Sequence, residues 1–123
     1  MIVTIPGTPP KALSPNGRPN RWQKHAAAQQ LKNDAFHATQ QAIGAPRNPV
    51  PVLTLPLTLN VVIAWEGRRE CDPDNAWASM KYAIDGIALA LCIDDRHIIP
   101  GAIQQERDPE KKGFIRVAIE EAT

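Results

Sequence analysis

Five aspartates and a lysine lie in the segment from Arg69 to Ile98, and no other part of the sequence gathers so many residue types that could do chemistry. Asp72 and Asp74 are two residues apart, so on an extended chain their carboxylates point to the same side. Hard cations such as Mg²⁺ take oxygen ligands, often from one or two carboxylates together with a substrate phosphate. This spacing predicts a divalent-metal site. The aspartates of the segment are Asp72, Asp74, Asp85, Asp94 and Asp95.

A purely structural explanation accounts for one end of this segment. Asp72 as an N-cap, Pro73 at the first helical position and Asp74 in the first turn make a good helix start without any function. The other end is different, because Asp94 and Asp95 follow the expected helix, where negative charge opposes the helix dipole. Two acids placed against local preference favour a functional site.

Lys81 stands between the two acidic ends. On a helix, Asp74, Lys81 and Asp85 fall within about 40° of one another at 100° per residue. Lys81 either forms a helical ion pair with Asp85, four residues on, or neutralises the charge of a phosphate. The sequence alone leaves both open.

The charge is unevenly distributed along the chain. The first 33 residues carry five Lys and Arg and no acid, a charge of +5, whereas the whole chain has a net charge of +1. A basic arm joined to an acidic body suits a polyanion partner, although chance clustering on a solvated surface explains the charges equally well. Trp22 and His25 lie in this arm, and contact with nucleic acid is one of their two interpretations. The candidates for phosphate contact are Arg18, Arg21, Lys24, Arg68 and Arg69.

Composition excludes several classes of protein. A chain of 123 residues, 43% of them hydrophobic and 22% charged, predicts a single folded domain over residues 1–123. No apolar run reaches the roughly 18 residues that span a bilayer, and residues 1–30 lack the apolar core of a secretory signal. We expect a cytoplasmic protein whose two cysteines, Cys71 and Cys92, are reduced thiols.

Hydrophobic periodicity predicts the elements that would position these residues. Residues 52–65 alternate with period two, which indicates a half-buried strand whose early part lies at an edge or a bulge because of Pro56. Residues 20–43 and 73–91 have the apolar spacing of helices, so one helix is expected over each range. With shorter strands at 2–5, 98–103 and 114–119, the order is β-α-β-α-β-β. The expected fold is α+β, a mixed sheet packed with two helices.

Three short motifs in this order resemble the RusA family of Holliday junction resolvases, especially its phage-borne members. They are D-P-D-N at 72–75, K-x-x-x-D-G at 81–86 and D-D-x-x-I at 94–98. The Pro-rich start (IPGTPP) and the S-P-N-G-R stretch are also similar to the family, so the resemblance covers most of the chain. It implies a bacterial or phage-encoded homodimer that nicks four-way DNA junctions symmetrically with Mg²⁺, or with Mn²⁺ in its place.

Residue by residue, the resemblance implies that Asp72, Asp74 and Asp95 are metal-binding catalytic carboxylates, with Asp94 as an auxiliary ligand. It implies that Lys81 is an essential cation. In many family members the lysine follows the asparagine by three residues, whereas Lys81 follows Asn75 by six. This keeps the same helical face, one turn further along.

A continuous helix over 73–91 would separate Asp74 from Asp95 by roughly 25–30 Å at 1.5 Å per residue. Either the chain breaks near Gly86 and turns back, or two subunits of a homodimer bring together acids from opposite ends of their helices. We favour the second arrangement slightly. The rival functions are a non-catalytic branched-DNA-binding protein with the same fold, and a structural protein whose acids only cap helices.

Overall fold

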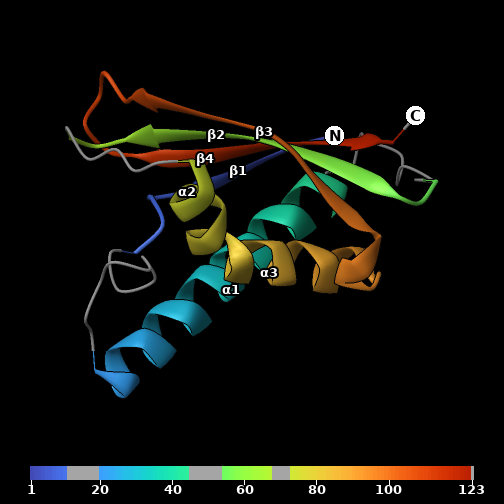
Figure 1. The fold of residues 1–123 in the computed structure, drawn as a ribbon, viewed down its shortest axis with the longest axis horizontal. Coiled ribbons are helices and arrows are strands. Elements are labelled where there is room, and N and C mark those ends of the chain that lie inside the picture. The colour runs from blue at the N-terminus through green and yellow to red at the C-terminus, as the bar shows by residue number, and fades with distance from the viewer. Residues whose placement is uncertain (11–19, 45–53, 68–72, 123) are drawn as a thin grey trace.

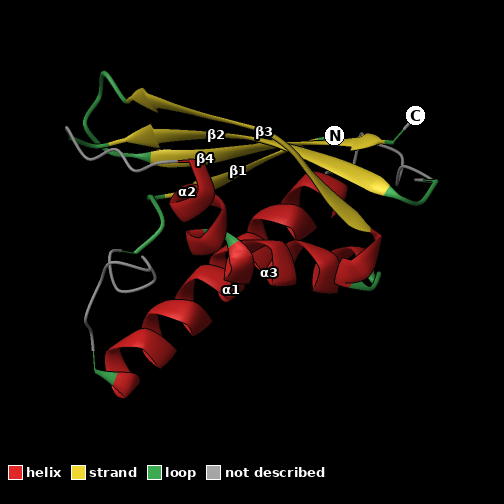
Figure 2. Cartoon of the chain, viewed as in Figure 1, coloured by secondary structure: helices red, strands yellow, loops and turns green. Residues whose placement is uncertain are grey.

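A four-stranded mixed sheet carries all of its helices on one face (Figures 1 and 2). The structure is a computed structural model, and it describes residues 1–10, 20–44, 54–67 and 73–122. The elements are β1 (Ile2–Pro6), α1 (Arg21–Gly44), β2 (Leu57–Trp65), α2 (Pro73–Ser79), α3 (Lys81–Leu91), the 3₁₀ turn η2 (Asp95–His97), β3 (Ile98–Arg107) and β4 (Phe114–Glu121).

The strands lie in the order β1-β4-β2-β3. β2 pairs with β3 in parallel, and the other two pairings are antiparallel. Parallel neighbours need a crossover connection, which the segment holding α2 and α3 supplies. The predicted α+β class and mixed sheet are therefore confirmed.

β2 supplies the centre of the core. Its alternate residues Leu57, Leu59, Val61 and Ile63 are almost completely buried, as the period-two pattern predicts. The strand is shorter than predicted, because residues 54–56 are not in a strand and 52–53 lie outside the described residues. Pro56 directly precedes β2, where its missing N–H costs the ladder nothing.

A stripe of small residues lets α1 pack closely on α3. Ala28, Leu31, Ala35 and Ala38 are buried on α1, as its periodicity predicts. On the facing side of α3, Gly86 lies so close to α1 that an added Cβ would overlap the backbone carbonyl oxygen of Lys32. The distance between the two helices therefore depends on glycine at this position.

The prediction of one continuous second helix is wrong. The chain breaks at Met80, which is fully buried and separates α2 from α3. The Met80 N–H donates to the carbonyl of Trp77, three residues back, and the Ser79 hydroxyl donates to the carbonyl of Ala76. Both contacts tighten the last turn of α2 and end it. The described residues thus form three α-helices and a 3₁₀ turn in place of the two predicted helices.

None of the helices in the described part of the chain combines the length and the apolar character that a membrane-spanning segment needs. The buried side chains form one core between the sheet and the helices.

Candidate nucleic-acid interface

The parallel pairing of β2 and β3 separates the two acidic ends of the motif segment. Leu57 at the start of β2 pairs with Ile98 at the start of β3, and Trp65 pairs with Arg107 at their far ends. α2 follows the end of β2, whereas η2 precedes the start of β3. α3, about 16 Å long at 1.5 Å per residue, lies between them. Figure 1 shows α2 and η2 at opposite ends of α3.

Asp74 therefore does not meet Asp94 and Asp95 within one chain. It lies in the first turn of α2, where its side chain is exposed. No three His, Cys, Asp or Glu side chains among the described residues are grouped so that they could hold a metal ion. Asp72, the other acid predicted at this end, lies outside the described residues, as do Arg18, Arg68 and Arg69.

Asp94 has a structural role that the sequence reasoning did not assign to it. α3 ends in a left-handed residue, Cys92, and Asp94 then caps η2 by accepting a hydrogen bond of 3.0 Å from the Arg96 N–H. This hydrogen bond lowers the pKa of Asp94 below its ordinary value, and a hydrogen bond with the neighbouring Asp95 side chain contributes a smaller lowering. Asp94 is therefore ionised at neutral pH, and its position is explained without a ligand. Asp95 is exposed beside it.

Lys81 and Asp85 share a face of α3, but the break at Met80 takes Asp74 off that helix. The Lys81 ammonium lies 5.9 Å from the centre of the Tyr82 ring. Asp85 is half-buried. The predicted grouping of Asp74, Lys81 and Asp85 on a single helical face is thus wrong, whereas the pairing of Lys81 with Asp85 on one face holds.

A cleft of about 360 Å³ opens between α1 and α3. Five polar side chains from one face of α1 line it, and Tyr82 and Asp85 of α3 complete it. Asp85 is the one carboxylate among these lining residues. The side chains from α1 are Arg21, Lys24, His25, Gln29 and Lys32.

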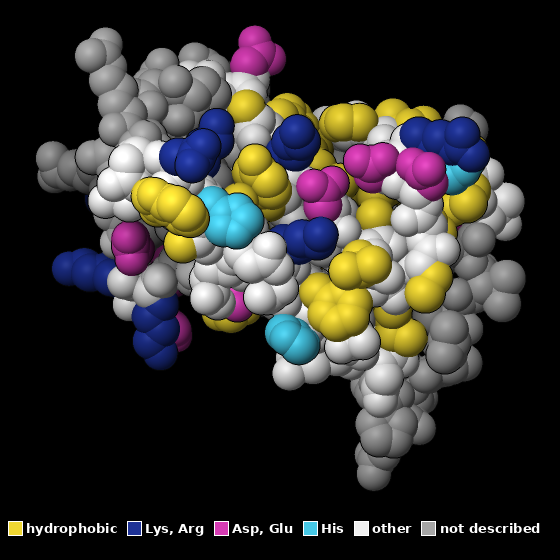
Figure 3. Space-filling model, turned by 90° about the horizontal axis from the view of Figure 1, so that it is seen from below, with side chains coloured by type: hydrophobic (Ala, Val, Ile, Leu, Met, Phe, Trp, Pro, Cys, Tyr) yellow, Lys and Arg dark blue, Asp and Glu magenta, His cyan; other side chains and the backbone are white. Residues whose placement is uncertain are grey.

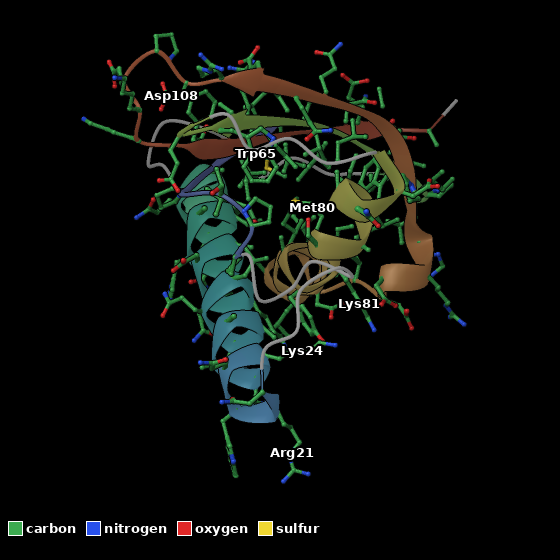
Figure 4. The ribbon with its side chains drawn as sticks, turned by 60° about the vertical axis from the view of Figure 1, so that its left-hand side comes forward. Arg21, Lys24, Trp65, Met80, Lys81 and Asp108 are labelled. Carbon is green, nitrogen blue, oxygen red and sulfur yellow. The ribbon has the colours of Figure 1, made fainter. Side chains whose placement is uncertain are left out.

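The cations that line this cleft form no ion pair with another described residue. Across the described ranges, ion pairs within 4 Å join Arg96 to Asp94 and Lys112 to Glu110, and none involves a cleft residue. Figure 3, which looks onto the helical side, shows basic and acidic side chains gathered over the helices. Figure 4 shows Lys24 on the side of α1 where Lys81 lies, with Arg21 at the N-terminal end of the helix.

Sequence reasoning found part of this cleft and missed the rest. Arg21 and Lys24 were predicted phosphate contacts, and they line it. Gln29, Lys32 and Tyr82 were not predicted. The positions 21, 25, 29 and 32 follow helical spacing, so a search for polar residues along one face of α1 would have found Gln29 and Lys32. Tyr82 requires knowledge of how α3 packs on α1.

A larger hollow of about 850 Å³ lies elsewhere, between the end of β1 and the turn that joins β3 to β4. Its buried carboxylate, Asp108, accepts hydrogen bonds from the backbone N–H groups of Glu110, Lys112 and Gly113. These bonds hold the turn, and they lower the pKa of Asp108. Because the Asp108 carboxylate is already bound by three backbone N–H groups, it is not available to a ligand. We therefore place the candidate interface at the cleft between α1 and α3.

No protein-family model matches the chain, and no curated protein is significantly similar to it in sequence.

Proposed function

We propose that this protein is a Mg²⁺-dependent endonuclease of RusA type that cuts branched DNA such as four-way junctions. The observation that carries the proposal is the cleft between α1 and α3, where no ion pair within 4 Å joins Arg21, Lys24 or Lys32 to a carboxylate of the described residues. Uncompensated cations along a groove attract a phosphate backbone. Lys81 adds a further cation at the start of α3. Such a protein would work in the cytoplasm of a bacterium, encoded by the host or by a phage.

The metal would be held by carboxylates, the ligands that Mg²⁺ prefers. Within one chain Asp74 and the pair Asp94 and Asp95 lie at opposite ends of α3, so they do not fit a single site there. We therefore propose a homodimer in which Asp72 and Asp74 of one subunit approach Asp94 and Asp95 of the other. A two-fold axis would duplicate this site, as symmetric nicking requires.

A bound Mg²⁺ would polarise the phosphoryl oxygen, activate water and stabilise the leaving oxygen, and Mn²⁺ could replace it. The protein's own contribution is positional and electrostatic. Arg21, Lys24 and Lys32 bind the backbone on either side of the scissile phosphate, and Lys81 supplies fixed positive charge near the reacting group. Phosphate contacts of this kind carry little base specificity.

Nicking of a synthetic four-way junction in the presence and absence of Mg²⁺ tests the activity. We expect Asp74→Asn to abolish nicking and to retain junction binding, because it removes a ligand and no phosphate contact. Glu120→Gln, an exposed acid of β4 away from the helices, is the matched control and should nick normally. Absence of Mg²⁺-dependent nicking by the wild-type protein would contradict the proposal.

Mixing two inactive variants tests the shared site. A dimer of one Asp74→Asn chain with one Asp95→Asn chain retains one intact site if the acids come from different subunits, so we expect partial recovery of nicking. If each site is built within one subunit, both sites of the mixed dimer stay damaged and no activity returns.

A second candidate is a non-catalytic protein that binds branched DNA through the same cleft. It is favoured by the finding that the described residues contain no group of three metal-ligating side chains. Junction binding that Mg²⁺ does not convert into nicking, and that weakens in Lys24→Glu, would identify this alternative.

A further inference from the structure

Trp22 is the most exposed large hydrophobic residue in the described part of the chain, with 73% of its surface accessible. The other two tryptophans are different, because Trp65 is buried in β2 and Trp77 is half-buried on α2. Exposing an indole to water is unfavourable, by roughly 25 cal/mol for each Å² of apolar surface. Packing against the other described residues does not explain why this side chain is apolar.

The start of α1 fixes the backbone that carries Trp22. The Asn20 side chain accepts a hydrogen bond of 2.8 Å from the Gln23 N–H, and the Gln23 side chain accepts one of 3.2 Å from the Asn20 N–H. This reciprocal pair is a capping box, which fixes the first turn of α1. An aromatic ring carried on a capped turn loses little entropy when a ligand stacks on it.

A cation lies against the indole, and others follow on the next turn of α1. The guanidinium of Arg21 lies 5.5 Å from the centre of the Trp22 ring. Arg21 also lines the cleft, together with Lys24 and His25 from the next turn. An exposed aromatic face beside a groove of cations is the arrangement with which proteins bind single-stranded nucleic acid, the base on the ring and the phosphates on the cations.

We infer that Trp22 is a stacking platform for an unpaired base, and that the strand carrying this base runs its phosphates along the cleft between α1 and α3. The inference rests on the proposed function and deepens it, since the bases at a branch point are the ones free to leave the duplex stack. Trp22 thus recognises a structural feature of the DNA, an unstacked base, and not a sequence.

Two oligonucleotides of equal charge separate the contribution of the base from that of the phosphates. One is a dodecamer of thymidine and the other is the same phosphodiester chain with abasic sites throughout. Stacking of one base on an aromatic ring corresponds to roughly a 5- to 150-fold gain in affinity. We expect the wild-type protein to bind the thymidine strand tighter than the abasic strand by a factor in this range, and its tryptophan fluorescence to be quenched by the thymidine strand alone.

Variants assign the effect to one ring. Trp22→Ala should bind both strands equally and about as tightly as the wild type binds the abasic strand, whereas Trp22→Phe should keep most of the preference. Leu89→Ala, which removes another exposed apolar side chain, should behave as the wild type. Because Trp22 contacts solvent, its variants should melt at the wild-type temperature.

Equal binding of the two strands by the wild-type protein would overturn the inference. It would leave the proposed function standing if four-way junctions were still bound and nicked. If Trp22→Ala still preferred the thymidine strand to the abasic strand, the base would stack on another residue and the inference would be wrong. Self-association that is lost in Trp22→Ala, with no change in strand preference, would instead assign the ring to contact between two copies of the chain.

Discussion

Gly86→Ala is a direct test of how closely α1 and α3 must approach. The added methyl group would overlap the Lys32 carbonyl oxygen, and it would lie 3.1 Å from the Cβ atom of Ala35. The oxygen belongs to the backbone of a helix and cannot rotate away. An ordinary contact would require the two helices to separate by roughly 1 Å.

Two opposing effects determine how much Gly86→Ala changes the free energy of unfolding. Replacing glycine by alanine inside a helix stabilises it by about 1 kcal/mol. Forcing an extra methyl group into a closely packed contact costs roughly 1–3 kcal/mol, and a backbone obstacle puts this substitution toward the upper end of that range. We therefore expect the free energy of unfolding to fall by about 1–2 kcal/mol, which lowers the melting temperature by roughly 4–12 °C for a chain of this size.

Urea and thermal denaturation of Gly86→Ala, compared with Gly44→Ala, provide the assay. Gly44→Ala is the matched control, because an added Cβ there has no heavy atom within 4 Å. We expect this control to be as stable as the wild type or slightly more stable. A Gly86→Ala protein that is as stable as Gly44→Ala, with an unchanged denaturant slope, would refute the close contact. Since Lys32 and Asp85 line the cleft beside Gly86, the variant should also bind DNA more weakly.

Two further substitutions test local hydrogen bonds that stabilise the fold. Asn20→Ala removes the cap of α1 and should lower the free energy of unfolding by roughly 1 kcal/mol in urea denaturation, and an unchanged midpoint would show that the cap contributes nothing. Asp108 has a pKa below its ordinary value of 3.8, so its ionised form stabilises the folded state above that pH, and this contribution is lost as the pH falls toward the lowered pKa. Asp108→Asn should therefore be less stable than the wild type at pH 7, by a margin that narrows at pH 3; a margin independent of pH would contradict this account.

Hydrophobic periodicity predicted most of the fold because the buried faces are regular. The alternate residues of β2 and the small-residue stripe of α1 are buried where the pattern predicts. The break at Met80 could not be predicted in this way, since Met80 and Ile84 keep the apolar spacing of a continuous helix. What ends α2 is the local hydrogen bonding of Ser79 and Met80, which hydrophobic spacing does not report.

The candidate site was less predictable, because it depends on how distant segments meet. Spacing along the chain identified the acids and the basic arm, but the pairing of α1 with α3 decides which cations share a cleft. Asp94 illustrates the difficulty, because its place after α3 suggested function, whereas in the structure it caps the next turn. The convergence of Asp72, Asp74 and Asp95 on a metal stays a prediction.

The strand order has a consequence for how the chain reaches its native state. Among the described strands β1 pairs with β4 alone, with Ile2 opposite Ala118 and Pro6 opposite Phe114. Pairing β1 with β4 closes a loop that contains every element between them. Closing this loop costs conformational entropy, and the cost must be met before the pairing contributes any stability. During synthesis β1 is made long before β4, so β1 stays unpaired until β4 has left the ribosome. Because β1 stays unpaired for so long, it is the strand to which a chaperone, or a strand from another chain, can most readily bind.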